Sequence, residues 1–156
     1  MNKLRYQSLI LLILSITCIS SSRAQEPAAE AGRMLTPIEA IQLADQNPAG
    51  GFTGTFEITV RSSKMSRMRV YLNSEEDYRD KRCLTLVLTR GNAVKIGKHL
   101  GLSLRKDLIN KKIRVHGTAK RKKIVFKSAG RVTGRFYYQT HIYVDDPDQI
   151  QLVDEI

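Results

Sequence analysis

Apolar and polar residues alternate along most of the chain after residue 50, and this pattern predicts a mainly β protein. In "TGTFEITV", residues 53–60, the apolar side chains Phe56, Ile58 and Val60 fall on every second position. A period of two is typical of a strand that has one face in a core and the other in water. The same pattern recurs in "SRMRVYLN" (66–73), "CLTLVLT" (83–89), "KKIRVHGTA" (111–119) and "FYYQTHIYVDD" (136–146). We therefore expect five strands.

Two segments have the pattern of helices instead. In "TPIEAIQLADQN", Thr36 can cap a helix, Pro37 suits the first helical position, and Glu39 completes a capping box. This helix should end at "NPAGG". The segment between the third and fourth strands, residues 91–110, has apolar residues at the four-residue spacing of a helix face: Ile96, Leu100, Leu104 and Leu108. Gly97 and Gly101 interrupt it, so this second helix is expected to be short.

The first residues have the composition of an export signal. Lys3 and Arg5 precede an uncharged apolar run, residues 9–19, and Ser22 and Ala24 have the small-residue spacing of a signal-peptidase site. A run of about 11 residues is shorter than the roughly 20 needed to span a bilayer. We expect residues 1–24 to be a signal peptide that is cleaved after Ala24, which makes the mature protein periplasmic or secreted. An uncleaved anchor is the alternative.

The rest of the chain is expected to form one domain with a short N-terminal extension. Residues 25–35 are small, polar and without period, which predicts a flexible leader. Residues 36–50 contain the first helix and its turn, and residues 51–156 contain the β domain. Loss of the signal peptide leaves Cys83 as the only cysteine. No intramolecular disulfide is then possible, and Cys83 is expected to be a small buried apolar residue.

The order of the elements, three strands, a helix and two strands, resembles the oligonucleotide/oligosaccharide-binding (OB) fold. The stretches "VYLNSEEDYRDKRCLTLVL", "NKKIRVHGTA" and "THIYVDDPDQIQLV" resemble small exported bacterial OB-fold domain proteins. This resemblance covers residues 51–153 and bears on fold more than on function. It implies a five-stranded OB-type barrel with a helix between strands 3 and 4, in addition to the short N-terminal helix. A β-sandwich is the alternative fold.

Positive charge is concentrated in the middle of the chain. The net charge is +11, but residues 61–135 contain 22 Lys or Arg against five acids, whereas the last twelve residues contain five acids and no base. Such a field predicts an anionic partner. The resemblance implies that ligands lie across strands 2 and 3, between two loops that are both basic here. The expected ligand-binding residues are Arg61, Lys64, Arg67, Arg69 and Tyr71, with Lys120, Arg121, Lys122, Lys123, Lys127, Arg131 and Arg135. We interpret "KRKK" as the base of a long hairpin that projects beyond the barrel.

Aromatic residues decide which anion is expected. Tyr71, Tyr78, Tyr137 and Tyr143 are candidates for stacking on bases, as in single-strand binding proteins, although packing in the barrel would explain Tyr137, Tyr138 and Tyr143 as well. Phe56 and Phe126 are expected in the core. The sequence therefore predicts a binding module for single-stranded nucleic acid first, and for an anionic glycan or lipid headgroup second. Docking on an acidic protein partner is an alternative, and lysines that protect strand edges from other chains are another.

No residue pattern predicts an enzyme or a cofactor. His99, His116 and His141 lack metal-ligand spacing; His116 and His141 are expected on the surface, paired across strands 4 and 5. The acidic stretch "SEEDYRD" contains Glu75, Glu76, Asp77 and Asp80. Beside Arg79 and Arg82 these carboxylates could hold Ca²⁺ near a phosphodiester, as in OB-type nucleases of the staphylococcal thermonuclease kind. The motifs of those enzymes are not matched here, so a metal-dependent nuclease is the minor alternative.

Overall fold

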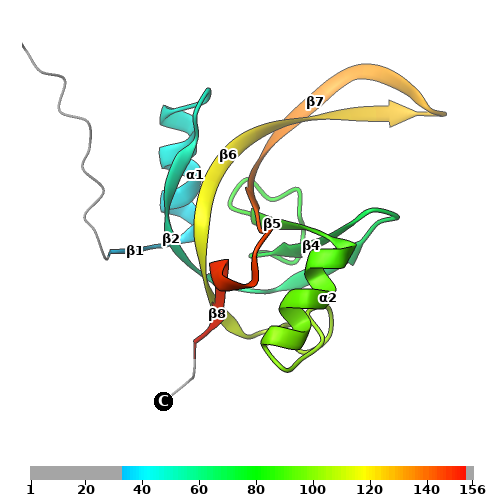
Figure 1. The fold of residues 1–156 in the computed structure, drawn as a ribbon. Helices are drawn as coiled ribbons and strands as arrows, with labels where there is room; N and C mark the ends of the chain where they lie inside the picture. Colours follow the sequence, from blue (N-terminus) through cyan, green and yellow to red (C-terminus); the bar gives the residue numbers. More distant parts are fainter. Residues whose placement is uncertain (1–32, 154–156) are drawn as a thin grey trace, which may run out of the picture.

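The computed structural model describes residues 33–153, and the predicted signal peptide lies outside these residues. The described chain is mainly β, with two α-helices and one short 3-10 helix (Figure 1). The helices are α1 (Pro37–Gln46), α2 (Arg90–His99) and the 3-10 helix η1 (Pro147–Gln149). The strands are β1 (Met34–Leu35), β2 (Phe52–Thr59), β3 (Ser62–Met65), β4 (Arg69–Asn73), β5 (Leu84–Thr89), β6 (Lys112–Ser128), β7 (Arg131–Tyr143) and β8 (Ile150–Leu152).

All eight strands belong to one mixed sheet. Its order is β1-β2-β6-β7-β5-β4-β3, and β8 pairs with β6 beside this path. The pairs β1–β2 and β5–β7 are parallel, and the other pairs are antiparallel. The sheet is open. The expected count of five strands is therefore corrected to eight, because β1, β3 and β8, which have two, four and three residues, are too short to show a period of two.

A bend between β2 and β3 curves the sheet strongly. The N–H of Val60 donates to the carbonyl of Lys111, 3.0 Å away, on the β6 side of the sheet. The N–H of the next residue, Arg61, donates to the carbonyl of Asn73, 2.8 Å away, on the β4 side. Val60 therefore pairs toward β6 and Arg61 toward β4, although β7 and β5 lie between these two strands in the sheet order. The sheet must curve around its apolar face to bring β6 and β4 to neighbouring residues.

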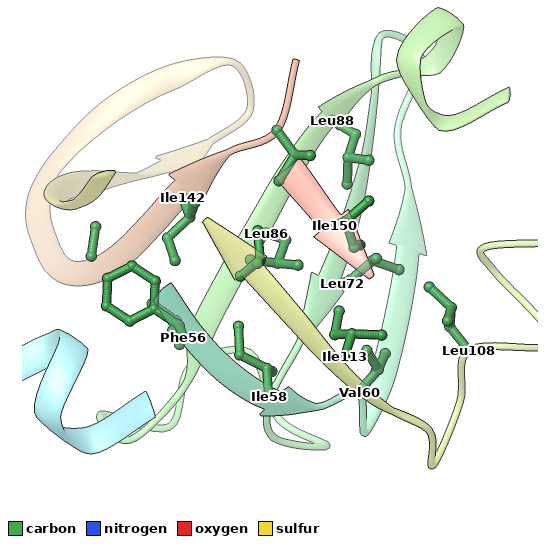
Figure 2. Close-up of a cluster of buried hydrophobic side chains, with 14 of the residues drawn as sticks. Phe56, Ile58, Val60, Leu72, Leu86, Leu88, Leu108, Ile113, Ile142 and Ile150 are labelled. Atoms are coloured by element: carbon green, nitrogen blue, oxygen red, sulfur yellow. The ribbon is translucent and has the colours of Figure 1, made fainter. Parts of the chain in front are cut away.

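The core lies on the concave face of this sheet (Figure 2). The predicted alternation of β2 is confirmed, since Phe56, Ile58 and Val60 are all fully buried. The neighbouring strands contribute Val70, Leu72, Leu84, Leu86, Leu88, Ile113, Val115, Ile142 and Ile150 to the same cluster. The helix α1 packs against the cluster through Ala40 and Ala44. Cys83 is also buried, as expected.

The first helix begins and ends where the sequence predicts, and the second is short, as expected, so Leu100, Leu104 and Leu108 of its predicted face lie beyond its end. The N–H of Glu39 donates to the Thr36 hydroxyl, 3.3 Å away, and the Glu39 carboxylate accepts the Thr36 N–H at 2.8 Å, so the capping box is present. The hydroxyl of Thr89 caps α2 by accepting the N–H of Asn92 at 3.1 Å. This helix ends at His99, and Gly101 follows with φ of +67°. Left-handed backbone of this kind suits glycine and stops a helix.

The last residues of the predicted leader are ordered as a strand. Met34 and Leu35 form β1 and pair with Thr55 and Phe56. Leu35 joins the core, and this gain of apolar burial explains why the leader prediction fails at residues 34 and 35. Residues 25–32 lie outside the described residues. Within the described part of the chain, no helix is long and apolar enough to span a membrane.

Candidate ligand-binding site

The strands β6 and β7 continue past the sheet as a hairpin, which arches away from it in Figure 1. Their ladder runs from the pair Ala119 and Ile142 to the pair Ser128 and Arg131 at the tip, where Ala129 and Gly130 turn the chain with positive φ. We call residues 120–136 the projecting hairpin. Almost all of them are exposed and none belongs to the core. The predicted long hairpin is thus present, although β7 begins at Arg131 rather than Phe136.

Basic and aromatic side chains interleave on the projecting hairpin and its base. The guanidinium of Arg121 lies 3.5 Å from the centre of the Tyr138 ring, and the ammonium of Lys123 lies 4.0 Å from the centre of the Phe136 ring. Arg135 lies 5.6 Å from the ring of Phe126. The exposed fractions of Phe126, Phe136 and Tyr138 are 37%, 48% and 42%. The expectation that Phe126 is in the core is wrong, because the hairpin extends beyond the sheet that would bury it.

The remaining predicted hairpin residues are exposed. Lys120 and Lys122 face His141 and Gln139 of β7 across the ladder, and Lys127 and Arg131 lie near the tip. Arg121 also forms a 3.0 Å ion pair with Asp45 of α1. This pair is the one ion pair formed by the hairpin's basic residues within residues 33–153.

The first predicted basic loop is largely strand. Lys64 lies in β3 and Arg69 lies in β4, with Arg67 in the turn between them. Arg61, at the bend, donates to the side-chain carbonyl of Asn110 at 3.3 Å. Arg69 lies 5.7 Å from the centre of the Tyr143 ring.

A pocket of about 290 Å³ joins the two predicted basic segments. It lies between the outer face of β3, β4 and β5, the loop of residues 74–83, and the projecting hairpin with the outer part of β7. Its lining residues are Lys64, Tyr71, Asn73, Tyr78, Thr85, Ile124, Tyr137, Gln139 and His141. We call it the tyrosine pocket. Of the predicted binding residues, it brings together Lys64 and Tyr71, whereas the others lie on the surface around it or along the hairpin.

The floor of the tyrosine pocket is a chain of buried and part-buried hydrogen bonds. The Thr85 hydroxyl donates to the side-chain carbonyl of Asn73 at 3.0 Å, and the Asn73 amide donates to the Ser62 hydroxyl at 3.1 Å. The Ser62 hydroxyl in turn donates to the carbonyl of Glu75 at 2.8 Å. Because these groups satisfy one another, the floor is rigid before any ligand binds.

A second set of contacts fixes the wall of the pocket. The side-chain amide of Gln139 donates to the carbonyl of Tyr78 at 2.6 Å, which leaves its oxygen to accept from His141 Nε2 at 2.9 Å. This orientation assigns the proton of His141 to Nε2, so Nδ1 is an acceptor. Burial, helped by the charges of Lys122 and Arg69, lowers the pKa of His141 from 6.5 to about 4. His141 is therefore neutral at pH 7.

The prediction of a surface histidine pair is wrong. His141 is 6% exposed, because the hairpin and the loop of residues 74–83 cover its face of β7. Lys120, not His116, lies opposite it. His116 lies opposite Thr55 of β2, and its Nδ1 is 3.2 Å from the Thr55 hydroxyl.

The pocket residues Asn73, Thr85, Gln139 and His141 were not predicted as site residues. All four occupy outward positions of their strands, which the period of two indicates. Their convergence depends on register, since β4 places Asn73 opposite Thr85 and β5 places Thr85 opposite His141. No local sequence signal predicts a register that pairs residues 56 positions apart, such as Thr85 and His141.

Comparisons with known proteins add a set of distant structural similarities. The chain matches no protein-family model and no curated protein. A protein assigned as an aspartyl-tRNA synthetase from Leishmania major Friedlin aligns with 85% of this chain and 22% of its own length, at a TM-score of 0.45 and 9% identity. The aspartyl-tRNA synthetase of Entamoeba histolytica aligns with 83% of this chain and 23% of its own length, at a TM-score of 0.45 and 15% identity. The chain thus spans less than a quarter of either synthetase.

One smaller structure aligns with this chain over nearly its whole length. A DUF3299 family protein from Pseudomonas aeruginosa PAO1 aligns with 80% of this chain and 97% of its own, at a TM-score of 0.38 and 11% identity.

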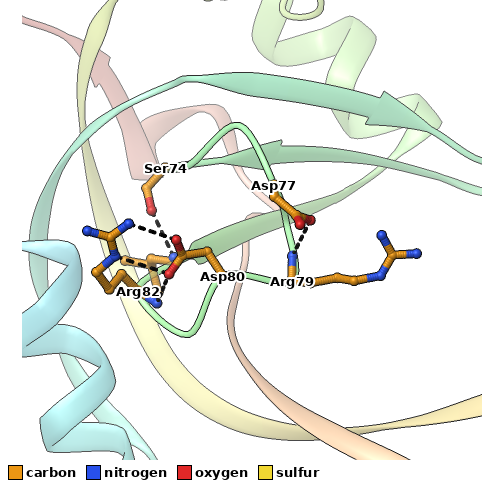
Figure 3. A network of polar contacts seen from close by, with 6 residues as sticks. Ser74, Asp77, Arg79, Asp80 and Arg82 are labelled. Atoms are coloured by element: carbon orange, nitrogen blue, oxygen red, sulfur yellow. Dashed lines mark hydrogen bonds and ion pairs between the residues drawn. The ribbon is translucent and has the colours of Figure 1, made fainter.

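Two carboxylates of the acidic loop beside the tyrosine pocket accept hydrogen bonds from residues of the same loop (Figure 3). The carboxylate of Asp77 accepts the N–H of Arg79 at 2.9 Å. Asp80 accepts the N–H of Arg82 at 2.8 Å and forms an ion pair with its guanidinium, also at 2.8 Å. Hydrogen bonds from Arg82 lower the pKa of Asp80 to about 2. Across residues 33–153, no group of three metal-ligating side chains is found.

Proposed function

We propose that this chain is an exported OB-type binding module for an anionic polymer, with single-stranded nucleic acid as the first candidate. One observation carries the proposal: exposed aromatic rings lie beside Lys and Arg on the projecting hairpin and its base. The pairs are Arg121 with Tyr138, Lys123 with Phe136 and Arg135 with Phe126. Single-strand binding combines cations that follow the backbone with rings on which bases stack. A sulfated glycan or an anionic lipid would also use the cations, so the stacking of bases on the exposed rings is what favours nucleic acid.

The topology supports the OB-type assignment. The strands β2 and β3 are separated by Val60 and Arg61 alone and continue one bent path, so the main path of the sheet can be read as a five-stranded, partly open barrel. The helix α2 lies between the third and fourth of these five strands, and the β5–β7 pair is parallel. In this reading the projecting hairpin is the loop between strands 4 and 5, one of the two loops that flank ligands in OB folds.

The charge distribution supports an anionic ligand. Within the described residues, the hairpin's basic side chains have one carboxylate partner, Asp45, so most of their charge faces water. Such a surface attracts polyanions through counterion release, and the affinity then falls steeply with salt. Export is part of the proposal because residues 1–24 have the features of a signal peptide.

Fluorescence anisotropy of a labelled dT12 oligonucleotide, measured across a salt series, tests the proposal. The triple variant Lys120→Ser, Lys122→Ser and Lys123→Ser should reduce the slope of log affinity against log salt by up to about 2, since each phosphate contact on a single strand contributes about 0.7. A matched control removes three exposed lysines on and after α2, Lys95, Lys98 and Lys106, and should change the slope much less.

The aromatic part of the proposal needs a separate variant. Phe136→Ala keeps every charge. It should weaken the binding of dT12 by about 1–3 kcal/mol and leave the binding of a heparin-like glycan unchanged. If the glycan binds as tightly as dT12 and Phe136→Ala affects neither, the nucleic-acid function is wrong and general polyanion binding remains. If no anionic polymer binds at low salt, the whole proposal is wrong.

A further inference from the structure

The tyrosine pocket is too small for a polymer, and its lining combines aromatic and aliphatic side chains with a few polar groups. We propose that it receives one planar heteroaromatic ring that carries an anionic group, that is, a single unstacked nucleotide of the bound strand. This inference rests on the proposed function, because the projecting hairpin is proposed to hold the nucleic-acid strand from which the nucleotide comes. It goes further, because it assigns one base to a site separate from the hairpin surface. It also predicts that bases at strand ends or in flexible single strands bind better than stacked bases do.

The size of the pocket limits the ligand. Its volume of about 290 Å³ is at the lower end of the roughly 300–1,000 Å³ found for small-molecule sites. One ring system with part of its sugar fits this space, whereas a base pair does not. A base must therefore leave its stack to enter, which costs a few kcal/mol in a duplex and least in a single strand.

The charge around the pocket determines the sign of the ligand. Tyr71, Tyr78 and Tyr137 could also form a cage for a cation. However, Lys64 and Arg79 already lie over the Tyr78 ring, 5.1 Å and 4.6 Å from its centre. None of the lining residues is Asp or Glu. A cationic ligand would meet repulsion without a counter-ion, whereas the ammonium of Lys64 can pair with a phosphate at the pocket rim.

The polar floor favours a base over a hydrocarbon ring. The side chains of Asn73, Thr85 and Gln139 form hydrogen bonds with other protein groups, and so does Nε2 of His141. Nδ1 of His141 has no hydrogen-bond partner among the described residues, so it is the acceptor that a ligand can use. Nucleobases have N–H or amino donors on their edges, and a phenyl ring has none.

A side chain that fills the pocket tests this inference. Ile124 lines the pocket, whereas Val94 lies in α2, away from the pocket and the hairpin, and is exposed. We expect Ile124→Trp to weaken dT12 about tenfold, because stacking of a base is worth about 1–3 kcal/mol. The matched control Val94→Trp adds the same ring at an exposed position of α2, outside the pocket and the projecting hairpin, and should bind dT12 like the wild type. Tyr71→Ala, which removes a wall, should also weaken dT12 about tenfold.

An oligonucleotide of equal length and charge whose residues are abasic provides the second arm. It should bind the wild type and Ile124→Trp equally, because it has no base to insert. If Ile124→Trp and Tyr71→Ala both bind dT12 as tightly as the wild type does, the pocket inference is overturned and the proposed function stands.

Free dTMP separates the two proposals. It should shift the NMR signals of the tyrosine pocket in the wild type and not in Ile124→Trp. If dT12 does not bind but dTMP still shifts these signals, the pocket is a nucleotide site and the polymer function is wrong. If neither ligand binds, both proposals are overturned.

Discussion

The stability of the fold should depend on pH through one buried histidine. His141 has a pKa of about 4 in the folded protein, against 6.5 for an ordinary histidine, chiefly because burial penalises its charged form. Between these two values the unfolded chain binds a proton that the folded chain does not bind. The free energy of unfolding should therefore rise as the pH is raised from 4 to 6.5, and His141 should contribute no further change above that range.

The size of this effect follows from the pKa difference. One pKa unit corresponds to about 1.4 kcal/mol, so the fall from 6.5 to about 4 gives His141 an effect of up to about 3 kcal/mol. The variant His141→Gln keeps an amide that can donate to Gln139 and has no proton to bind. It should lose this part of the pH dependence while remaining folded at pH 7.

Urea denaturation followed by far-UV circular dichroism at pH 4.5, 5.5 and 7.0 measures the effect. Glu39, Glu57 and Asp80 also have lowered pKa values and reduce stability at the acid end. Their contribution is shared by wild type and variant and cancels in the difference between them. A control variant, His116→Gln, removes an exposed histidine and should retain the wild-type profile. If wild type and His141→Gln show the same profile from pH 4.5 to 7.0, the reasoning about His141 is refuted.

Three further predictions concern stability and reactivity. Thr36→Ala removes the N-cap of α1 and should lower the free energy of unfolding in urea by about 1 kcal/mol; no change would mean that the cap is not formed in solution. Gly51→Ala should cost more, on the order of 1–3 kcal/mol in the same assay, because φ there is +78° and the new Cβ would lie 2.5 Å from the carbonyl oxygen of Ala119; Gly130→Ala, at a tip with φ of +79° and open space, isolates the backbone part of that cost. Cys83 is buried and burial raises the pKa of its thiol, so Ellman's reagent should label it only after unfolding; rapid labelling of the native protein would contradict the burial.

The local features of the fold follow from the sequence because their causes are local. The capping box at Thr36 and the alternation in β2 depend on residues a few positions apart, and both are present. The hairpin could be predicted because Lys120 to Lys123 break an alternation that has no core left to satisfy. These signals required no knowledge of which strands are neighbours.

The pairing between distant strands could not be predicted in this way. The bend at Val60 and Arg61 has no glycine or proline to mark it, and its two hydrogen bonds lead to residues 51 and 12 positions later. His141 has the same alternation signal as an exposed strand residue, and it is buried only because the hairpin and the loop of residues 74–83 meet over it. The pocket therefore depends on register and on the path of the hairpin, which tertiary packing determines.

The projecting hairpin keeps the residues proposed to bind a ligand apart from the residues that form the core. The cluster of buried residues takes Ala119 from β6 and Ile142 from β7, and nothing from the hairpin between them. Mutation can therefore recharge the exposed positions of this segment, or change the length of its tip, with little effect on the core of the domain. Proteins with the same core could evolve different ligand preferences by exchanging this one segment, and an engineer could graft the hairpin of one such protein onto another at these two residues.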